Sequence, residues 1–519
     1  MSGTAIARPD AGRTGNEAQL PGLAAAVAEW EAVATCPRRL LVAGEWREAR
    51  SGLTMVVSDP ATGRALCEVP DAGERDAADA LAAAATSMAE WSACAPRERA
   101  RVLRRAAEAM VCDTDRLAML ITLEMGKPLA ESRAEVAFAA EYLEWCADEA
   151  VRISGLVQQS PDGGSRIMVV RCPVGPCLII TPWNFPLAVP ARGVAAALAA
   201  GCSVVLRPSS LTPLSAMALA AILQAEGLPA GVLNVVVSTA EGATDALLTD
   251  PRLRRLTFTG STAVGRHLVA RSADQLLRVG LELGGQAPFL VFPDADLDAA
   301  VDGAVAAKMR NGGQACTAAN RFHVHRELVE EFTDRLARRL GALALGRGTE
   351  PGVDLGPMIG ESQRRRLGEL VDDAVRRGAR TVCEGGTVPG PGHFFAPVVL
   401  RDAPEDARVC REEIFGPVAS VSVFDRESEV VARANRCAQG LGAYVYTRDV
   451  ERAFRVRGAR GRDGHGEPRA HLIGGGAVRR GEALGIRTRR RLRSPGRLPA
   501  DPVTDRRRVR HPLTAPRPP

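Results

Sequence analysis

The sequence predicts an α/β protein that contains a parallel sheet. Short runs rich in Val, Ile and Leu, at residues 177–181, 203–206, 232–237 and 256–259, alternate with Ala-rich segments of helical spacing. Such alternation is typical of βαβ crossovers, which place consecutive strands parallel to one another. The 519 residues exceed one ordinary hydrophobic core, so two or three domains are expected.

The chain before this alternation is mostly helical. Residues 74–111 and 117–153 have helical spacing, and residues 156–174 hold two apolar strands around the turn Pro161–Gly164, which predicts a β-hairpin. Residues 1–22 mix Arg, Asp, Gly and Pro without a continuous apolar run. We therefore expect a disordered leader, reaching about residue 36, rather than a signal peptide.

Composition places the protein among soluble globular proteins, with 46% hydrophobic and 25% charged residues. The longest apolar run, residues 193–206, is interrupted by Gly201 and Ser203 and is too short to cross a bilayer, so no membrane association is expected. Twelve cysteines at irregular spacings favour free thiols in a reducing cytoplasm. No zinc-ligand pattern is present, so no metal is expected.

Cys316 is the candidate nucleophile. It lies among small residues in the segment 311–317, and 34 positions after Glu282 in the acidic turn Leu281–Gly285. A thiol attacks an aldehyde only as thiolate, and a carboxylate can take its proton and later activate water. A buried structural thiol is the alternative, but a core strand would alternate large apolar residues at these positions.

Asn184 is the candidate oxyanion donor. It lies in the segment Thr181–Pro186, which follows an apolar strand and carries a proline on each side of the asparagine. The prolines restrict the backbone, so the side-chain amide can be held ready to donate a hydrogen bond to a thiohemiacetal oxyanion. Taken alone, the segment is equally typical of a structural turn with a packed Trp183.

From about Leu40 to about Arg455 the chain resembles the aldehyde dehydrogenase superfamily, NAD(P)-dependent enzymes that oxidise aldehydes through a cysteine thiohemiacetal. Five motifs in the family's order carry the resemblance: Thr181–Pro186, Phe258–Gly265, Leu281–Gly285, Gly313–Cys316 and Glu412–Val418. The resemblance implies an aldehyde dehydrogenase-like fold, with two parallel-sheet α/β domains and a β-hairpin oligomerisation arm.

The resemblance also implies a domain organisation. Residues 37–152 and 172–284 would form the cofactor-binding domain, 153–171 the oligomerisation hairpin, and 285–458 the catalytic thiol domain. Members of the family assemble as homodimers or homotetramers.

The cofactor implied by the resemblance is NADP or NAD. Residues Gly260–Gly265 resemble the family's turn in which small residues at a helix N-terminus admit the pyrophosphate. The segment Arg207–Ser210 stands where the family usually has Lys-Pro-Ser-Glu. Ser210 replaces the glutamate of that motif, which removes a negative charge, and Arg207 can pair with a phosphate. Both changes favour NADP, whose 2′-phosphate is anionic. By the same resemblance the cofactor site comprises Pro182, Trp183, Arg207, Ser209, Ser210, Gly260, Ser261, Thr262, Gly265, Leu283, Glu413 and Phe415.

Arg192 and Arg310 indicate the substrate class. They lie eight residues after Asn184 and six before Cys316, so both can line a substrate tunnel and bind a carboxylate bidentately, although surface or structural arginines are commoner. These positions match the succinate-semialdehyde dehydrogenase branch. The small-molecule substrate expected is succinate semialdehyde, then glutarate semialdehyde, with a general aldehyde dehydrogenase as the fallback.

Residues 459–519 depart from the family. They contain 16 arginines, no lysine and five acidic residues, a net charge of +11, whereas the whole chain carries +6. Such a tail ordinarily indicates nucleic-acid binding or disorder. The genetic code favours another interpretation, in which no nucleic acid is bound.

Read one base later with suitable codons, residues 471–485 permit Ile-Ser-Ser-Ala-Ala-Ala-Pro-Phe-Gly-Gly-Val-Lys-Arg-Ser-Gly, which resembles the family's C-terminal loop. Residues 462–466 likewise permit Glu-Thr-Gly-Met-Val, the strand before it. We infer a frameshift between about Phe454 and Arg462. As written, 459–519 would be a disordered, out-of-frame tail lacking the tunnel-closing loop, a serine of the carboxylate clamp, the final helix and the last strand, and the chain would be an impaired or inactive product.

Overall fold

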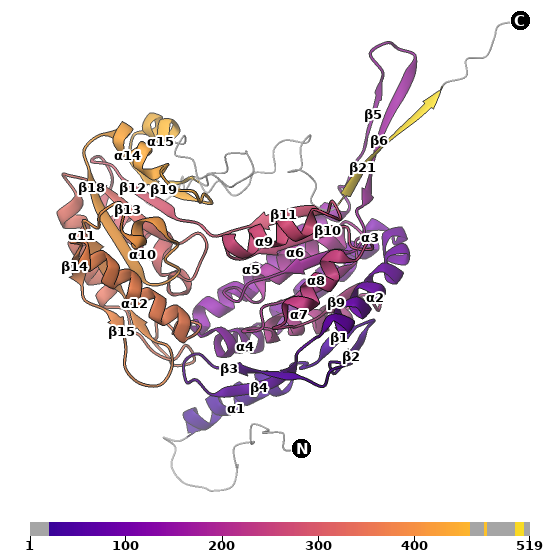
Figure 1. Ribbon diagram of the computed structural model, residues 1–519, viewed down its shortest axis with the longest axis horizontal. Coiled ribbons are helices and arrows are strands. Elements are labelled where there is room, and N and C mark those ends of the chain that lie inside the picture. The colour runs from indigo at the N-terminus through magenta and orange to yellow at the C-terminus, as the bar shows by residue number, and fades with distance from the viewer. Residues whose placement is uncertain (1–19, 457–471, 475–503, 513–519) are drawn as a thin grey trace, which may run out of the picture.

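The computed structural model describes residues 20–456, 472–474 and 504–512, and it has two α/β lobes with a projecting β-ribbon (Figure 1). Each lobe is built on one seven-stranded sheet whose neighbouring strands are mostly parallel. The predicted α/β fold is confirmed. Both sheets also carry antiparallel strands at one edge, which the sequence did not indicate.

The sheet of the first lobe has the strand order β11-β10-β7-β8-β9-β1-β2. Its parallel strands are β7 (Cys177–Ile180), β8 (Val204–Arg207), β9 (Leu233–Val235), β10 (Arg255–Thr259) and β11 (Arg278–Glu282), and its antiparallel edge is β1 (Leu40–Val42) and β2 (Glu45–Arg47). The order reverses between β7 and β10. In open α/β sheets such a switch point leaves a crevice at the carboxyl ends of the strands, where ligands bind.

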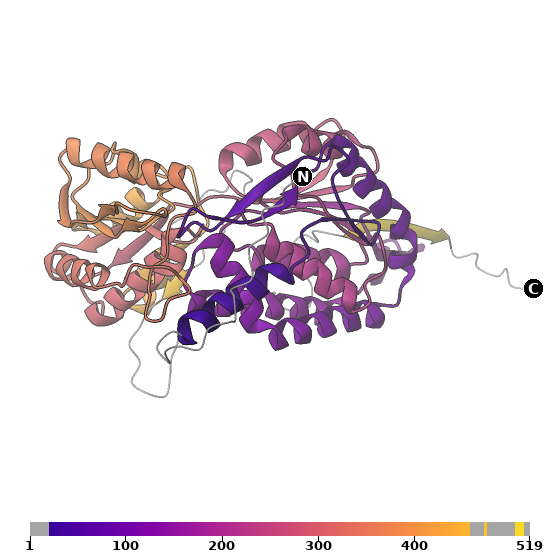
Figure 2. The ribbon, with the colours of Figure 1, turned by 90° about the horizontal axis from the view of Figure 1, so that it is seen from below.

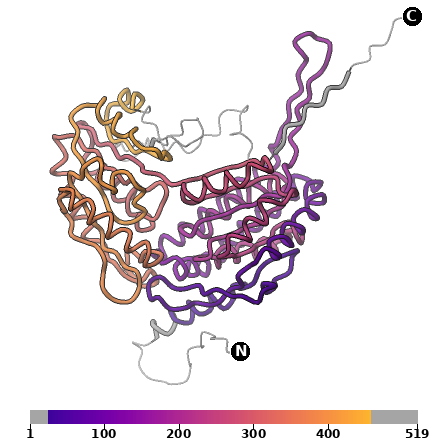
Figure 3. The backbone as a smooth tube through the Cα atoms, in the orientation of Figure 1, coloured from indigo at the N-terminus to yellow at the C-terminus, as the bar shows by residue number. Residues whose placement is uncertain are grey.

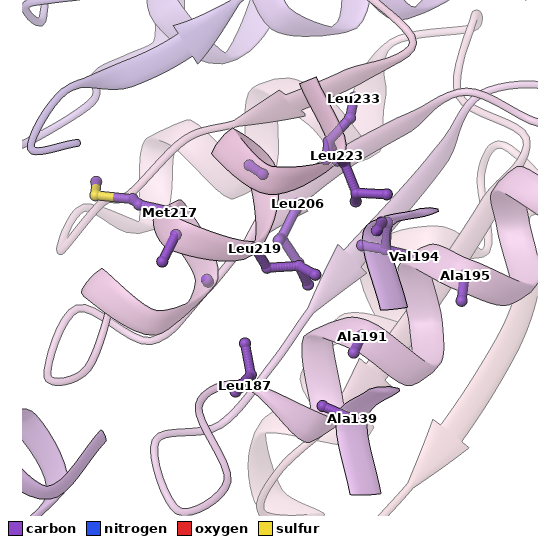
Figure 4. Close-up of a cluster of buried hydrophobic side chains, with 14 of the residues drawn as sticks. Ala139, Leu187, Ala191, Val194, Ala195, Leu206, Met217, Leu219, Leu223 and Leu233 are labelled. Atoms are coloured by element: carbon purple, nitrogen blue, oxygen red, sulfur yellow. The ribbon is translucent and has the colours of Figure 1, made fainter. Parts of the chain in front are cut away.

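Helices cover both faces of this sheet. The helices that follow its strands are α6 (Ala188–Ala199), α7 (Leu214–Ala225), α8 (Glu241–Thr249) and α9 (Thr262–Ser272), and those that precede them are α2 (Glu74–Ala93), α3 (Pro96–Cys112), α4 (Thr114–Met125) and α5 (Leu129–Ala150). One face is covered by α2, α8 and α9, and the other by α3 to α7. The core between α5, α6, α7 and the sheet is closely packed, with Leu206 and Leu219 fully buried (Figure 4).

The two predicted helical stretches are each divided by a loop. Pro96 begins α3, because proline has no amide hydrogen to donate within a continuing helix. Gly126 ends α4 with a φ of 96°, a left-handed conformation that favours glycine. The loop of Gly126, Lys127 and Pro128 between α4 and α5 becomes important at the site.

The sheet of the second lobe has the order β14-β17-β18-β13-β12-β19-β20. Its strands are β12 (Ala287–Val291), β13 (Ala319–His325), β14 (Arg380–Cys383), β17 (Val398–Arg401), β18 (Val418–Phe424), β19 (Ala443–Tyr446) and β20 (Leu472–Gly474). Its helices are α10 (Leu297–Met309), α11 (Val329–Gly341), α12 (Glu361–Arg376), α13 (Arg408–Arg411), α14 (Glu427–Ala434) and α15 (Val450–Val456). Phe289 lies at the centre of this lobe's core and stacks on Tyr444 and Tyr446.

The ribbon contains the predicted hairpin, β5 (Leu156–Gln159) and β6 (Ser165–Pro173), joined by the expected turn. It leaves Leu156, Val157, Met168 and Val170 between 41% and 62% exposed. Two further small pairs are β3 (Thr54–Ser58) with β4 (Ala65–Pro70) and β15 (Gly386–Thr387) with β16 (Phe395–Ala396). Among the described residues no helix is long and apolar enough to cross a membrane.

The expectation of a disordered leader to residue 36 is wrong for residues 20–36. Helix α1 (Leu20–Ala34) lies against the first lobe (Figure 2) and buries Ala32 and Val33. Glu29 of this helix forms a bidentate ion pair with Arg347, both contacts at 2.9 Å. Residues 1–19 lie outside the described residues.

The expectation that residues 459–519 form no strand is wrong for two segments. Residues 472–474 extend the second sheet as β20, parallel to β19, and β21 (Thr504–Pro512) pairs along the whole of β6 in the ribbon (Figure 1). The hairpin of β5 and β6 projects away from the first lobe (Figure 3). The physical reason is that an exposed strand edge offers backbone donors and acceptors, which pair with a backbone of any sequence. The expectation that the chain lacks the tunnel-closing loop, the serine and the final helix concerns residues outside the described ones.

Candidate active site

The candidate site lies where the two lobes meet. The first lobe contributes the loops that follow β7, β10 and β11, and the second contributes η2 (Arg310–Gly313) with the residues up to β13. Asn184, Glu282 and Cys316, far apart in the sequence, are thereby brought into one region.

Asn184 is 4% exposed and is held by three hydrogen bonds. Its side-chain Nδ2 donates to the carbonyl of Gln314 at 2.9 Å, and its own carbonyl accepts from Lys127 Nζ at 2.8 Å and from Asn311 Nδ2 at 2.9 Å. An amide nitrogen has two hydrogens, so one remains for a ligand. The residue therefore joins the two lobes and keeps a donor for an oxyanion.

The nucleophile loop has a backbone that few sequences adopt. Asn311, Gly312 and Gly313 have φ values of 54°, 60° and 74°, all in the left-handed region. A Cβ at Gly313 would lie 2.3 Å from the carbonyl oxygen of Gly416, so only glycine fits. Gln314 then fixes the loop through its side chain, which donates to the Pro357 carbonyl at 3.3 Å and accepts from Ile359 N at 3.0 Å.

Cys316 is half-buried, and its environment favours the thiol over the thiolate. The pKa of Cys316 is raised to about 11, chiefly by burial and also by Glu413 and Glu282, while Arg192 opposes the rise. The thiol is therefore protonated at neutral pH, and attack requires a base. The influence of the Glu282 carboxylate on this thiol places the predicted base within electrostatic reach of the predicted nucleophile.

Glu282 is the last residue of β11, and its backbone carbonyl accepts a hydrogen bond from Gly260 N at 3.0 Å. The turn that follows touches the second lobe, because a Cβ on Gly285 would lie 2.5 Å from the Cys316 carbonyl oxygen and a Cβ on Gly284 would lie 2.1 Å from Glu413 Oε2. Two successive glycines are thus needed for the lobes to approach each other beside the candidate base.

Both predicted substrate arginines lie in the same region as the nucleophile. Arg192, on α6, donates to Thr259 Oγ1 at 3.2 Å and also hydrogen-bonds the hydroxyl of Tyr142. Arg310 lies over the ring of Phe185 at 4.9 Å. Burial raises the pKa of Tyr142, Arg192 and Arg310 lower it, and Glu282 raises it. Tyr142 thus lies among both arginines and the candidate base.

The predicted turn for the cofactor pyrophosphate begins α9. Ser261 caps this helix by accepting a hydrogen bond from Val264 N at 3.3 Å, and the first turn carries no acidic residue. A Cβ on Gly260 would lie 2.5 Å from the Phe258 ring, and one on Gly265 would lie 2.6 Å from Leu283. An uncluttered helix N-terminus of this kind fits an anionic phosphate.

The residues predicted for the adenosine end follow β8. Arg207 donates to the Ser238 carbonyl at 2.9 Å, and its buried Nε has no hydrogen-bond partner among the described residues. Ser209 and Ser210 are half-buried beside it. An orphaned guanidinium donor with no neighbouring glutamate in this loop fits an additional phosphate.

The residues predicted for the nicotinamide end come from both lobes. Trp183 and Phe415 meet edge to face with ring centroids 5.3 Å apart, and Pro182 precedes this tryptophan in the loop after β7. Glu413 Oε1 accepts a hydrogen bond from Gly285 N at 3.2 Å. Burial raises the pKa of Glu413 to about 7. The residues present therefore fit a dinucleotide that runs from Arg207 to Glu413.

Comparison with known sequences decides the family. A model of the Aldehyde dehydrogenase family matches residues 46–460, which is more than half of the chain. The chain belongs to the aldehyde dehydrogenase family. It is therefore an oxidoreductase that acts on aldehydes.

Several curated relatives in this family are similar over most of their length. The chain is 50% identical over 392 residues to a succinate-semialdehyde dehydrogenase of Paenarthrobacter nicotinovorans, covering 75% of this chain and 87% of the relative. It is 44% identical to the NADP(+) succinate-semialdehyde dehydrogenase GabD of Escherichia coli, covering 81% and 87%. It is 45% identical to a glutarate-semialdehyde dehydrogenase of Pseudomonas aeruginosa, covering 80% and 86%.

A solved structure of the family shares the fold. The crystal structure of succinate-semialdehyde dehydrogenase from Burkholderia pseudomallei aligns with a TM-score of 0.81 at 44% identity, covering 85% of this chain and 89% of that one.

Sequence reasoning missed several residues of this aldehyde dehydrogenase. The site or its loops are contacted by four residues for which the sequence predicted only a helical stretch: Lys127, Glu131, Glu135 and Tyr142. The break Gly126–Pro128 between two helices, followed by acids four residues apart, was the available signal. Among the described residues no cluster of three or more His, Cys, Asp or Glu is arranged to hold a metal.

Proposed function

We propose that this aldehyde dehydrogenase oxidises a short aldehyde bearing a distal carboxylate to the corresponding dicarboxylate. Succinate semialdehyde is the first candidate and glutarate semialdehyde the second. The observation that carries this choice is the placement of Tyr142 among Arg192 and Arg310, beside a site where Arg192 also influences Cys316. Two cations and a hydroxyl at one end of the site are suited to a carboxylate. Relatives named for both substrates support it.

The first step joins the aldehyde to Cys316. Glu282 takes the thiol proton, the sulfur lone pair forms a bond to the carbonyl carbon, and the carbonyl electron pair moves onto oxygen. The spare hydrogen of Asn184 Nδ2 then donates to that oxyanion, as expected of an oxyanion donor. Because the pKa of Cys316 is raised to about 11, only a small fraction of the thiol is ionised at neutral pH, and proton removal by Glu282 speeds the attack.

The second step releases the acid. Once the adduct has been oxidised to a thioester and Glu282 has released the thiol proton to solvent, Glu282 takes a proton from water, and the water oxygen bonds to the thioester carbon. The carbon–sulfur bond breaks and the pair returns to the Cys316 sulfur, leaving the carboxylic acid. One carboxylate thus acts twice, in opposite halves of the cycle.

NADP, with NAD as the second choice, supplies the two-electron oxidation when bound. Gly260, Ser261, Thr262 and Gly265 would hold its pyrophosphate at the start of α9, and Glu413 would hold the nicotinamide ribose. Trp183 and Phe415 would border the nicotinamide, with Pro182 and Leu283 beside them. The orphaned Nε of Arg207, with Ser209 and Ser210 in place of an acid, favours the 2′-phosphate of NADP. A relative whose name specifies NADP(+) supports this preference.

The lobes have separate tasks in this proposal. Residues 37–152 and 172–284 bind the cofactor, residues 285–458 carry the thiol, and the hairpin 153–171 takes part in subunit contact. Exposed apolar side chains on the hairpin, among them Val157 at 62%, support a role in assembly.

The frameshift is a second proposal, which makes the chain as written an impaired product. The family match ends at residue 460, inside the interval from Phe454 to Arg462 where the reading frame is inferred to change. Resequencing the gene across these codons tests this proposal directly. A chain whose residues after the break are read one base later is called the frame-restored protein.

Steady-state kinetics of the frame-restored protein tests the function. Reduced-cofactor formation should be fastest, as kcat/KM, with succinate semialdehyde, then glutarate semialdehyde, and much slower with butanal. Cys316→Ala should abolish it, since no other thiol has both a base and an oxyanion donor. Activity near the parent level in the Cys316→Ala variant, or a higher kcat/KM for butanal than for the semialdehydes, would contradict the proposed function.

A further inference from the structure

The first two turns of α5 present two carboxylates to two different active-site loops. Glu131 and Glu135 are four residues apart and therefore share one face of the helix. Glu131 Oε2 accepts from Asn311 N at 2.8 Å, in the nucleophile loop. Glu135 Oε1 accepts from Leu187 N at 2.9 Å and Ala188 N at 3.1 Å, at the end of the loop that carries Asn184.

Lys127 lies between these carboxylates and the catalytic loops. Its Nζ contacts Glu135 Oε2 at 2.5 Å and the Asn184 carbonyl at 2.8 Å, and it lies 4.1 Å from the centre of the Phe185 ring. Both side chains of the ion pair are only 1% exposed. Lys127 also lowers the pKa of Glu131, which burial raises. One ammonium group thus acts on both carboxylates and on the backbone of Asn184.

The contacts form a continuous connection between the lobes. Asn311 Nδ2 donates to the Asn184 carbonyl, which Lys127 also binds, and to the Gln314 carbonyl at 3.2 Å. The Lys127 loop itself is pressed against the second lobe, since a Cβ on Gly348 would lie 2.5 Å from the Lys127 carbonyl oxygen. Any shift of Lys127 therefore moves the Asn184 carbonyl relative to the nucleophile loop.

Stability alone is a poor reason for this arrangement. Burying an ion pair costs desolvation free energy that its attraction often fails to repay, and apolar side chains of similar volume frequently stabilise a fold equally well. What a buried, fully hydrogen-bonded pair does supply is a fixed geometry, because any other arrangement leaves a charge without a partner.

We propose that Lys127, Glu131 and Glu135 are positioning residues that hold the oxyanion donor Asn184 in register with the nucleophile Cys316 across the junction of the lobes. The inference rests on the proposed function, because it requires covalent addition of an aldehyde to Cys316. The three residues touch neither substrate nor cofactor. They act through the two loops that do.

The test measures aldehyde addition to Cys316 in the full chain without cofactor. Butanal protects Cys316 from iodoacetamide by forming the thiohemiacetal, and mass spectrometry of the Cys316 peptide gives the protection constant. Asn184→Ala should weaken protection by about 10-fold or more, consistent with the large effects seen when an oxyanion donor is removed. Lys127→Met and Glu135→Gln should weaken it similarly, and Glu131→Gln should weaken it to a lesser extent.

A double-mutant cycle distinguishes positioning from general destabilisation. If Lys127 acts through Asn184, then Lys127→Met should change protection by less than about twofold in the Asn184→Ala background. Lys127→Arg keeps a cation and donors, and should restore part of the protection lost in Lys127→Met. Glu135→Gln keeps the shape of glutamate. If Lys127→Met does not fold, the same double-mutant cycle is measured with Glu135→Gln in its place.

Glu124 provides the matched control. It is a fully buried carboxylate on α4 that accepts from Leu214 N at 2.7 Å and Ser215 N at 2.9 Å, at the start of α7, as Glu135 does at the start of α6. Glu124→Gln should lower the melting temperature about as much as Glu135→Gln while leaving butanal protection unchanged.

Three results would overturn the inference, and one of them would also contradict the proposed function. Unchanged protection in Lys127→Met and Glu135→Gln, with Asn184→Ala weakened, would overturn positioning alone. Unchanged protection in Asn184→Ala would remove the oxyanion role on which the proposed function depends, and the inference with it. Independent, multiplying losses in the double mutants would show that the buried residues only stabilise the fold.

Discussion

Asn184 and Gln314 are joined by a hydrogen bond of 2.9 Å from the side-chain Nδ2 of the first to the carbonyl of the second. The bond links the loop after β7 in one lobe to the nucleophile loop of the other, two residues before Cys316. The two catalytic loops are therefore held in one geometry before any substrate arrives, as electrostatic preorganisation requires.

The double role proposed for Glu282 predicts a separable defect. Glu282→Gln keeps the shape of the side chain but accepts no proton, so thioester hydrolysis should slow more than its formation. Rapid-mixing kinetics of the frame-restored protein should show a burst of reduced cofactor of normal size followed by slow turnover. A missing burst, with the Cys316 thiol still unmodified, would assign Glu282 a different role.

Arg192 and Arg310 should control the choice of substrate. A hydrogen bond to a charged group contributes about 1.5 to 3 kcal/mol, which corresponds to roughly 10 to 100-fold in affinity. Arg192→Ala and Arg310→Ala should each raise KM for succinate semialdehyde by about this factor and leave butanal little affected. Equal losses on both aldehydes, measured side by side in the frame-restored protein, would mean that the arginines are structural.

Tyr142 should contribute a smaller share of the same selectivity. Its hydroxyl accepts a hydrogen bond from Arg192, so its own hydrogen is available to a substrate carboxylate. Tyr142→Phe should raise KM for succinate semialdehyde by about 3 to 10-fold, with kcat and butanal kinetics unchanged, since a single hydrogen bond contributes about 1 kcal/mol. Tyr446→Phe, in the core of the second lobe, is the control and should change neither KM. An unaltered KM in Tyr142→Phe would exclude the contact.

The reactivity of Cys316 should respond in opposite directions to two charges. Its pKa is raised to about 11, chiefly by burial and next by Glu413, and Arg192 opposes the rise. Glu413, whose pKa is about 7, is ionised at pH 8 and above. At pH 8 to 9, Glu413→Gln should therefore lower the thiol pKa and speed alkylation of Cys316 by iodoacetamide. Arg192→Ala should raise the pKa and slow it.

The measurement for this charge effect is the alkylation rate of the Cys316 peptide, followed by mass spectrometry in the full chain. The parent rate should rise about tenfold per pH unit below pH 11, because only the thiolate reacts. Variants that shift the rate in the same direction would contradict the assigned influence of the two charges.

Restoring the reading frame should improve both assembly and turnover. In the chain as written, residues 504–512 include four arginines and only two apolar residues, Val509 and Pro512, so this strand brings little apolar surface to a subunit contact. We expect that chain to be weakly stable or aggregated and severely impaired in turnover. Light scattering after size exclusion, together with NADPH formation from succinate semialdehyde, compares the two proteins. If the chain as written and the frame-restored protein have the same oligomer mass and the same turnover, the inferred frameshift does not affect function.

Local sequence was sufficient for the α/β fold and for the candidate catalytic residues. The strands at residues 177–181 and 256–259 are recognisable because a parallel strand buried on both faces reads as an apolar run. Cys316 is recognisable because the small residues around it leave its sulfur accessible to a substrate. Asn184 is recognisable because the prolines on either side restrict its backbone. Pattern at short range therefore predicted the fold class, which is confirmed, and the candidate catalytic residues, whose roles stay a prediction.

The tertiary structure alone decided how these residues are held. Lys127 and Glu135 read as ordinary charges near the start of a helix, and the separation between Lys127 and Asn184 is 57 positions. The same holds for α1, whose Glu29 reaches Arg347 across 318 positions. Local pattern cannot reveal that a charge is buried against a backbone carbonyl from a distant segment, because burial and partners are fixed only when the lobes pack together.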